Sequence, residues 1–146
     1  MRNMLFLGLM ILLILGLSAE GEAEEIFEGP VFADVIEVLD GDTISVSASV
    51  WLEQDIMTHV RLLGVDTPEI KGKCQKEKEL ARKAKQITVN FLRTSKIIEL
   101  RNVKRGKYFR IVADVFGDNI SLTETLINSG YAVPYYGNKK TKNWCL

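Results

Sequence analysis

The chain has 146 residues, and its 19 Lys and Arg balance its 19 Asp and Glu to a formal net charge of zero. This length suits one domain with a single hydrophobic core rather than several domains. One histidine and the absence of Cys-x-x-Cys spacing argue against a zinc site.

The first residues follow the three-part pattern of a secretory signal. Arg2 precedes an apolar run from Met4 to Leu17, and small residues and then acids follow it. The run is too short to cross a bilayer comfortably. We therefore predict a signal peptide over 1–23, cleaved between 19 and 23, and a secreted or periplasmic mature protein. An uncleaved membrane anchor is the alternative. Residues 24–30 are expected to form an acidic, flexible N-terminus.

Charge is distributed unevenly along the rest of the chain. Residues 24–70 contain eleven acids and one basic residue, Arg61, whereas residues 71–110 contain fourteen Lys and Arg and three acids. This layout predicts a negative pocket beside a positive field, which suits a cation and a polyanion. A solvated helix face is the ordinary alternative for the lysines.

Five runs are typical of β-strands. The first two alternate in hydrophobicity and are joined by "DGD", a tight-turn signal, so we expect a hairpin. The last two flank the basic turn "KRGK". The predicted strands cover residues 31–39, 43–50, 56–65, 96–103 and 108–116. In the second, Ile44, Val46, Ala48 and Val50 are expected on one face.

Two segments predict helices. Residues 76–93 place an apolar stripe at helical spacing, formed by Leu80, Ala84, Ile87 and Phe91. Ser121 and Glu124 form a capping box for a shorter helix that Gly130 ends. Its expected buried side consists of Leu122, Leu126 and Ile127. We predict an α+β, mainly β domain over 31–146, a five-stranded OB-fold barrel with one long and one or more short helices packed on it.

Acids and arginines accompany the ends of these strands. Asp42 and Asp66 both stand where a rigid sheet can aim side chains at a common point, and two carboxylates with a carbonyl suit calcium, at roughly 2.3–2.6 Å. Glu69 could act as a general base toward water. Arg61 and Arg110, on predicted strands, could bind phosphate oxygens in pairs. Spacing alone leaves open a turn aspartate, a loop glutamate and surface arginines.

Three segments, "VLDGDTISV", "VRLLGVDTPEI" and "GKYFRIVADVF", resemble the staphylococcal (micrococcal) nuclease family in this order. The resemblance covers about residues 31–137. It implies an OB-fold barrel and a calcium-dependent endonuclease, a hydrolase that cuts phosphodiester bonds of DNA and RNA with little sequence preference. It also implies that the chain acts as a monomer with no stable protein partner.

Matched position by position, the resemblance implies a role for each motif residue. Asp42, Asp66 and the carbonyl of Thr67 would bind calcium, with Asp40 as a further acid nearby. Glu69 would position or deprotonate the attacking water. Arg61 and Arg110 would grip the scissile phosphate, and Tyr108 and Tyr136 would lie beside the bound nucleotide. Phe109 departs from the family, which usually has glycine there.

Cys74 and Cys145 are an even number in a chain predicted to be exported, so they can pair. They also stand where exported bacterial members of the family carry cysteines.

Two non-enzymatic readings compete with the nuclease. One is a nucleic-acid-binding OB-type module without catalysis. The other is a small envelope adaptor that uses its basic helix to hold anionic surfaces. Degenerate binding copies lose acids or arginines, and here all five charged positions are present, which favours the enzyme.

Overall fold

The computed structural model describes residues 25–146, except the side chain of Phe109, so the predicted signal peptide lies outside the described residues. Among the helices of this described part, none combines the length and the apolar character needed to span a membrane.

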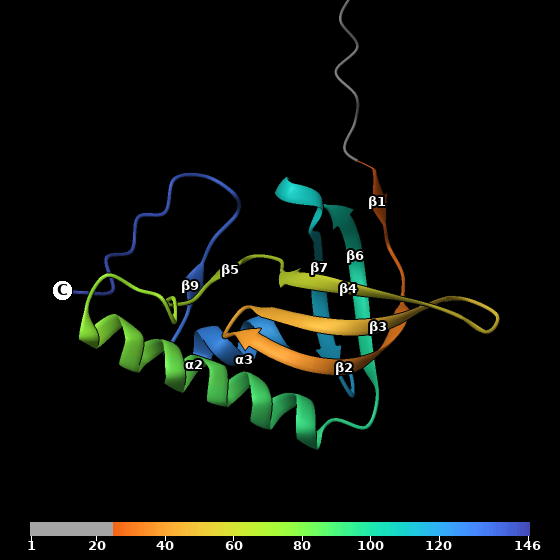
Figure 1. Cartoon of the computed structure of the whole chain (residues 1–146), viewed down its shortest axis with the longest axis horizontal. Helices are drawn as coiled ribbons and strands as arrows, with labels where there is room; N and C mark the ends of the chain where they lie inside the picture. Colours follow the sequence, from red (N-terminus) through yellow and green to blue (C-terminus); the bar gives the residue numbers. More distant parts are fainter. Residues whose placement is uncertain (1–24) are drawn as a thin grey trace, which may run out of the picture.

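Five strands close into a barrel (Figure 1). Three form an antiparallel meander: β2 (Val31–Asp40), β3 (Thr43–Trp51) and β4 (Gln54–Leu62). Strand β4 then runs parallel to β7 (Ile111–Gly117), and β7 pairs antiparallel with β6 (Ile98–Arg105). Strand β6 also pairs with β2, with Val31 opposite Leu100, and this pairing closes the barrel. The predicted OB-fold arrangement is confirmed.

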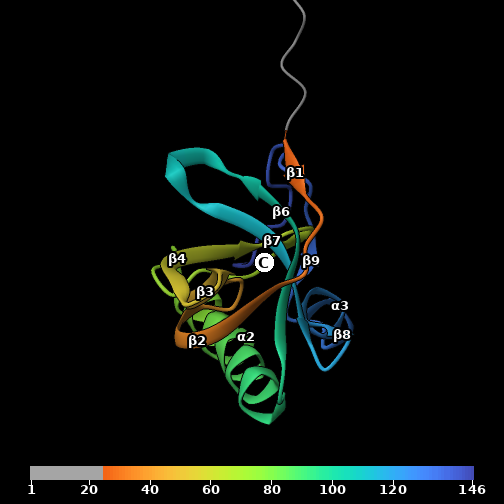
Figure 2. The ribbon, with the colours of Figure 1, turned by 90° about the vertical axis from the view of Figure 1, so that its right-hand side faces the viewer.

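Four short strands extend this frame. Strand β1 (Ile26–Phe27) lies within residues 24–30, the segment expected to be flexible, and it pairs with β6 (Figure 2). Strand β8 (Ile120–Ser121) follows β7 and pairs with it. Strand β5 (Val65–Asp66) pairs with β9 (Val133–Pro134) as a separate two-stranded sheet. The last pairing matters for the site, because it joins the loop after β4 to the C-terminal segment.

Two helices pack on the barrel. Helix α2 (Gln75–Thr94) runs beneath it in Figure 1. Helix α3 (Leu122–Asn128) is capped by Ser121, whose side chain accepts the N–H of Glu124 as predicted. The expected stripe of α2 is rotated slightly. Its buried residues are Ala81, Ala84, Thr88 and Leu92, while Leu80, Ile87 and Phe91 are half-buried. Ala84 faces the β2–β3 turn, which approaches the helix closely at Gly41.

The core fills the barrel with alternate strand residues. Ile44, Val46 and Ala48 of β3 point inward as predicted, and Leu122 and Leu126 of α3 are fully buried. Val50 is exposed, because the β3–β4 hairpin projects beyond the barrel (Figure 1). Val50 is therefore not part of the core that the other three residues form.

Two predicted strands end differently from the expectation. The run 56–65 is broken after Leu62 by a turn in which Gly64 takes a positive φ of 77°. The run 108–116 begins as a strand only at Ile111, because Lys107–Phe109 form a tight turn, η1, in which Tyr108 takes a positive φ of 59°. The N–H of Gly106 donates to the carbonyl of Arg110 at 2.8 Å across this turn. Placing Arg110 on a strand was therefore wrong: it stands immediately before β7.

Candidate functional site at the β2–β3 turn and the β5 loop

Asp42 occupies the tight turn between β2 and β3 and is only 3% exposed. Its Oδ2 accepts the backbone N–H of Thr67 at 3.0 Å, and its Oδ1 accepts the hydroxyl of Thr43 at 3.0 Å. The carboxylate thus joins the β2–β3 turn to the loop after β5, two segments far apart in sequence. A buried carboxylate with this many donors is held in one place.

Helix α2 supports this turn from below. The hydroxyl of Thr88 donates to the carbonyl of Gly41 at 2.6 Å. A Cβ added at Gly41 would lie 2.9 Å from both Ala84 Cβ and Thr67 Oγ1, closer than real side-chain contacts allow. Glycine at this position therefore lets helix, turn and loop meet.

Arg61 brings the two predicted metal ligands together. It lies on β4, and its Nη1 forms an ion pair with Asp42 Oδ1. Its Nη2 lies 3.4 Å from Asp66 Oδ1 and donates to the carbonyl of Val65 at 3.4 Å. Asp66, on β5, is as buried as Asp42. The structure thus gathers four residues predicted from sequence: Asp42, Arg61, Asp66 and Thr67.

Glu69 stands at the open edge of this group, after Pro68, and its side chain is 59% exposed. Lys140 Nζ lies 2.8 Å from Glu69 Oε1 and 2.9 Å from Asp66 Oδ1. The hydrogen bond and the charge of Lys140 lower the pKa of Glu69 below its ordinary value, so Glu69 is a carboxylate at neutral pH. Burial opposes this effect only in part.

Lys140 was not predicted from sequence. It is a lysine in a polar C-terminal segment, and nothing in its spacing points to Glu69, 71 residues earlier, or to Asp66. Burial by itself would lower the pKa of Lys140, but the hydrogen bonds and charges of Asp66 and Glu69 outweigh burial and raise it. Lys140 is therefore a permanent cation at this site.

Asp40 lies beside the group and is half-buried. Its Oδ1 accepts the N–H of Gly41 at 2.9 Å. Burial raises the pKa of Asp40 above its ordinary value, and the negative charges of Asp42 and Glu69 add to this, although backbone N–H groups oppose it. The ionised form of Asp40 is therefore disfavoured by its surroundings.

Glu77 holds the loop that carries Glu69. Its carboxylate accepts the N–H of Lys73 at 2.9 Å and the N–H of Glu69 at 3.4 Å. Cys74 caps α2, since its Sγ accepts the N–H of Glu77 at 3.3 Å. The Cys-x-x-Glu spacing at this helix start resembles a capping box, and that signal could have identified Glu77 in the sequence.

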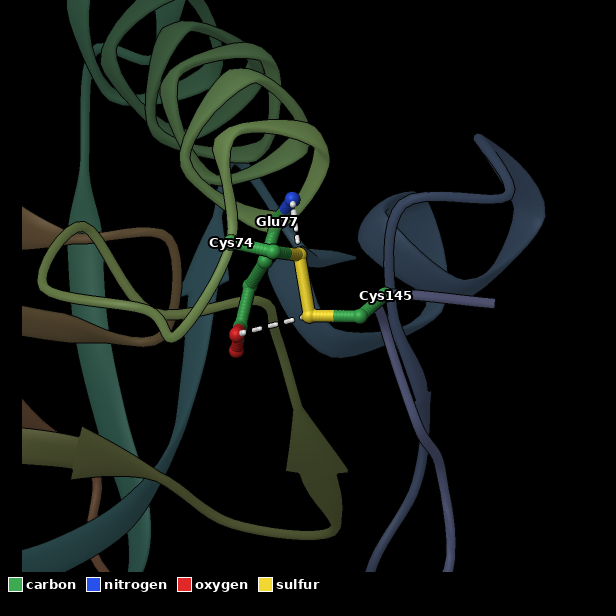
Figure 3. Close-up of side chains that lie close together, drawn as sticks. All are labelled: Cys74, Glu77 and Cys145. Atoms are coloured by element: carbon green, nitrogen blue, oxygen red, sulfur yellow. Dashed lines mark hydrogen bonds between the residues drawn. A yellow bond between two sulfur atoms is a disulfide. The ribbon is translucent and has the colours of Figure 1, made fainter.

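Cys74 and Cys145 form a disulfide with a Cα–Cα distance of 6.0 Å, as their even number allowed. Glu77 Oε2 lies 3.9 Å from Cys145 Sγ, a contact without a hydrogen bond because a disulfide sulfur carries no proton (Figure 3). Among the described residues these three side chains cluster as metal ligands would. Since both thiols are consumed in the bond, they do not form a metal centre.

The other three predicted residues are exposed and stand on other segments than this group. Arg110 is exposed, and it precedes a strand that runs parallel to β4 with Ile111 opposite Val60, so it emerges one strand away from Arg61. Tyr108 is 85% exposed in the η1 turn. Tyr136 is 80% exposed, and its ring lies against the turn at Gly64. Both rings present a face to solvent.

Comparison with known proteins decides the family. Residues 59–145, more than half of the chain, match the family described as "Staphylococcal nuclease homologue". The chain belongs to the staphylococcal nuclease family. A relative, the uncharacterized protein MJ1439 of Methanocaldococcus jannaschii, is 30% identical over 137 residues. The match covers 77% of this chain and 63% of that protein, so the chain spans less than two thirds of the relative's length.

In this member of the staphylococcal nuclease family a hollow of about 520 Å³ opens beside the acids. It lies between the loop after β5 and the C-terminal segment, and Asp66, Thr67, Glu69 and Lys140 line it. Lys71, Lys73 and Lys142 add positive charge to its walls. The volume falls in the range of small-molecule sites, and the mixed charges suit a phosphate-bearing ligand.

The donor set of this nuclease-family site fits calcium. Asp42 and Asp66 offer hard carboxylate oxygens that are fixed by a rigid sheet, and Thr67 follows Asp66 directly in the buried loop. Thr67 Oγ1 is buried without a hydrogen-bond partner, so an unpaired oxygen lies next to the carboxylates. Within the described residues no thiol is free to attract a softer metal.

Proposed function

We propose that this protein is an exported, calcium-dependent nuclease that hydrolyses phosphodiester bonds of DNA and RNA with low sequence preference. The observation that carries the proposal is the grouping of Asp42, Arg61, Asp66 and Glu69 in a member of the staphylococcal nuclease family. We also propose that it acts outside the cytoplasm, since the apolar run at residues 4–17 follows the secretory pattern. A further part of the proposal is that it acts as a monomer.

Asp42, Asp66 and the carbonyl of Thr67 would hold the calcium ion. When bound, calcium supplies positive charge that neutralises the phosphate and polarises its oxygens. The protein's own contribution is rigidity: the ligands come from a tight turn and a two-residue strand that hydrogen bonds fix from both sides. A fixed site loses little energy to reorganisation during the reaction.

Glu69 is suited to accept a proton from water. Its lowered pKa keeps it ionised at neutral pH, and its side chain is exposed, so that water reaches the carboxylate. The water oxygen would attack phosphorus as Glu69 takes the proton, the bond from phosphorus to the leaving sugar oxygen would break, and that oxygen would take up a proton from solvent to leave as a hydroxyl.

Arg61, on β4, and Arg110, immediately before β7, would bind the non-bridging phosphate oxygens. A guanidinium offers paired N–H donors that match a phosphate, and such donors act most strongly on charge that grows in the transition state. Tyr108 and Tyr136 offer exposed rings on which bases could stack, a contact that tolerates any sequence.

The test is incubation of the protein, purified from the medium or periplasm of an expressing bacterium, with plasmid DNA and with single-stranded RNA. We expect cleavage of both with calcium and none with excess EGTA, and no cleavage by Asp66→Asn under either condition. Full cleavage in EGTA without any divalent ion would refute the mechanism. Binding of both nucleic acids without cleavage would instead support the non-catalytic module.

A further inference from the structure

Lys140 lies inside the acidic site although it comes from the far end of the chain. Its Nζ is within hydrogen-bond distance of both Asp66 Oδ1 and Glu69 Oε1, at 2.9 and 2.8 Å. Asp66 is almost fully buried, with 4% of its side chain exposed, while the side chain of Lys140 is 44% exposed. The lysine therefore reaches in from solvent and ends on an acid predicted to bind metal.

The C-terminal segment holds Lys140 in this position from both sides. Before it, β9 pairs with β5, and the N–H of Tyr135 donates to the carbonyl of Gly64 at 3.0 Å. After it, Trp144 is buried and Cys145 is bonded to Cys74 at the start of α2. A side chain anchored on both flanks has a high effective concentration at its partners.

The ammonium and a divalent ion would compete for the same oxygen. Asp66 Oδ1 already contacts both Lys140 and Arg61. These two cations face three acids, Asp42, Asp66 and Glu69, so the group keeps a net negative charge. A calcium ion at roughly 2.3–2.6 Å from Asp66 would lie within a few ångströms of the Lys140 ammonium, in a partly buried place where like charges repel strongly.

We propose that Lys140 is a tethered competitor of the metal: its ammonium neutralises Asp66 and Glu69 in the metal-free protein and leaves Asp66 when a divalent cation binds. The inference rests on the proposed calcium site. In this proposal Lys140 sets the affinity of the site for metal. The C-terminal segment, which carries Lys140, thereby takes part in the site. Lys140 thus stabilises the metal-free site and lowers the affinity of that site for a divalent cation.

Calcium binding measured by titration calorimetry, without nucleic acid, tests this directly. Lys140→Met keeps the aliphatic stem and removes the charge. The matched control is Lys139→Met, because Lys139 is its exposed neighbour in the same segment. We expect Lys140→Met to bind calcium about tenfold more tightly than the wild type, the change that one partly buried charge pair supports, and Lys139→Met to match the wild type.

Thermal unfolding in EDTA gives a second readout. Lys140→Met should melt below the wild type without metal, since Asp66 then keeps only Arg61, and calcium should raise its melting temperature by more than it raises that of the wild type. Equal or weaker calcium affinity in Lys140→Met would overturn the inference, even in an active nuclease. Tighter binding without any cleavage would uphold it while refuting the proposed activity. No calcium binding by either protein would overturn both.

Discussion

At the scale of single residues, the two arginines carry the same charge in different surroundings. The side chain of Arg61 is only 18% exposed and lies between two buried aspartates, whereas Arg110 is exposed before β7. We therefore expect Arg61 to contribute more than Arg110 to the stability of the folded protein. Both are proposed to bind the phosphate, so loss of activity alone cannot separate them.

Alanine at each position should separate these two roles. Arg61→Ala leaves Asp42 without its ion pair and should lower the free energy of unfolding by about 2 kcal/mol, whereas Arg110→Ala should change it by no more than about 0.5 kcal/mol. Both should slow single-turnover cleavage on the order of 10²–10³-fold. Urea denaturation in EDTA and rapid-quench cleavage are the measurements. Equal stability losses in the two variants would contradict this assignment.

Asp118 offers a pH-dependent test far from the acids. Its carboxylate accepts the N–H groups of Lys96 and Ile97 at 2.9–3.1 Å, and these hydrogen bonds lower the pKa of Asp118 below its ordinary value of 3.8. A lowered folded-state pKa stabilises the protein fully above pH 3.8, and this stabilisation is lost as the pH falls through the folded pKa.

Asp118→Asn should therefore melt below the wild type at pH 6, and the gap should close as the pH falls below about 4. Asparagine tolerates the positive φ of 49° at this position, so the backbone adds no penalty. Melting curves between pH 2.5 and 7 measure the gap. Asp34→Asn, on the exposed side of β2, is the control and should show a much smaller gap throughout. A gap for Asp118→Asn that persisted unchanged at pH 2.5 would argue against the charge as its cause.

At the scale of elements, α2 and the β2–β3 turn act as one unit. The hydroxyl of Thr88 is fully buried and reaches the carbonyl of Gly41, one residue before Asp42. Thr88→Val preserves shape but leaves this carbonyl without a donor, so we expect a loss of about 1–2 kcal/mol. Chemical denaturation measures it. Thr94→Val, at the exposed last turn of α2, should cost clearly less, and equal costs would show that the buried contact is unimportant.

The elements themselves could be predicted well from the sequence, because periodicity and capping are local. The hairpin at "DGD", the α3 cap at Ser121 and the extent of α2 all followed from neighbours within a few residues. Of the two misplaced ends, the start of β7 follows from the local turn at Lys107–Phe109, whereas the other depended on a distant partner. The strand after Leu62 breaks because β5 pairs with β9 some seventy residues later, and no local pattern reports that pairing.

The residues of the candidate site likewise fall into those that local motifs predict and one that only distant pairing brings in. Asp42, Arg61, Asp66 and Glu69 could be proposed because they fall in recognisable motifs at strand ends, and the structure places them together. Lys140 could not, since its contact with Asp66 is created by the β5–β9 pairing and the disulfide. Roles in catalysis stay predictions for all of them.

At the scale of the whole molecule, the Cys74–Cys145 disulfide spans 71 residues. Loop-closure entropy gives an upper figure of about 4 kcal/mol for a bond across so long a loop. Cys74→Ser/Cys145→Ser should therefore unfold at a clearly lower urea concentration than the wild type. Dithiothreitol should lower the wild type's midpoint toward that of the variant and leave the variant unchanged. Identical midpoints for oxidised wild type and variant would show that the bond contributes nothing to stability.

The same bond makes residues 74–145 a covalent ring. Helix α2, β6, β7 and α3 lie within it, while Asp42 and Asp66 lie on the chain outside it. A protease that cuts once in the exposed turn around Lys107 would open the ring without releasing a fragment, because the disulfide still joins the two pieces. In an oxidising medium the nicked protein therefore remains one covalent molecule, and its separation requires both a cut and a reductant.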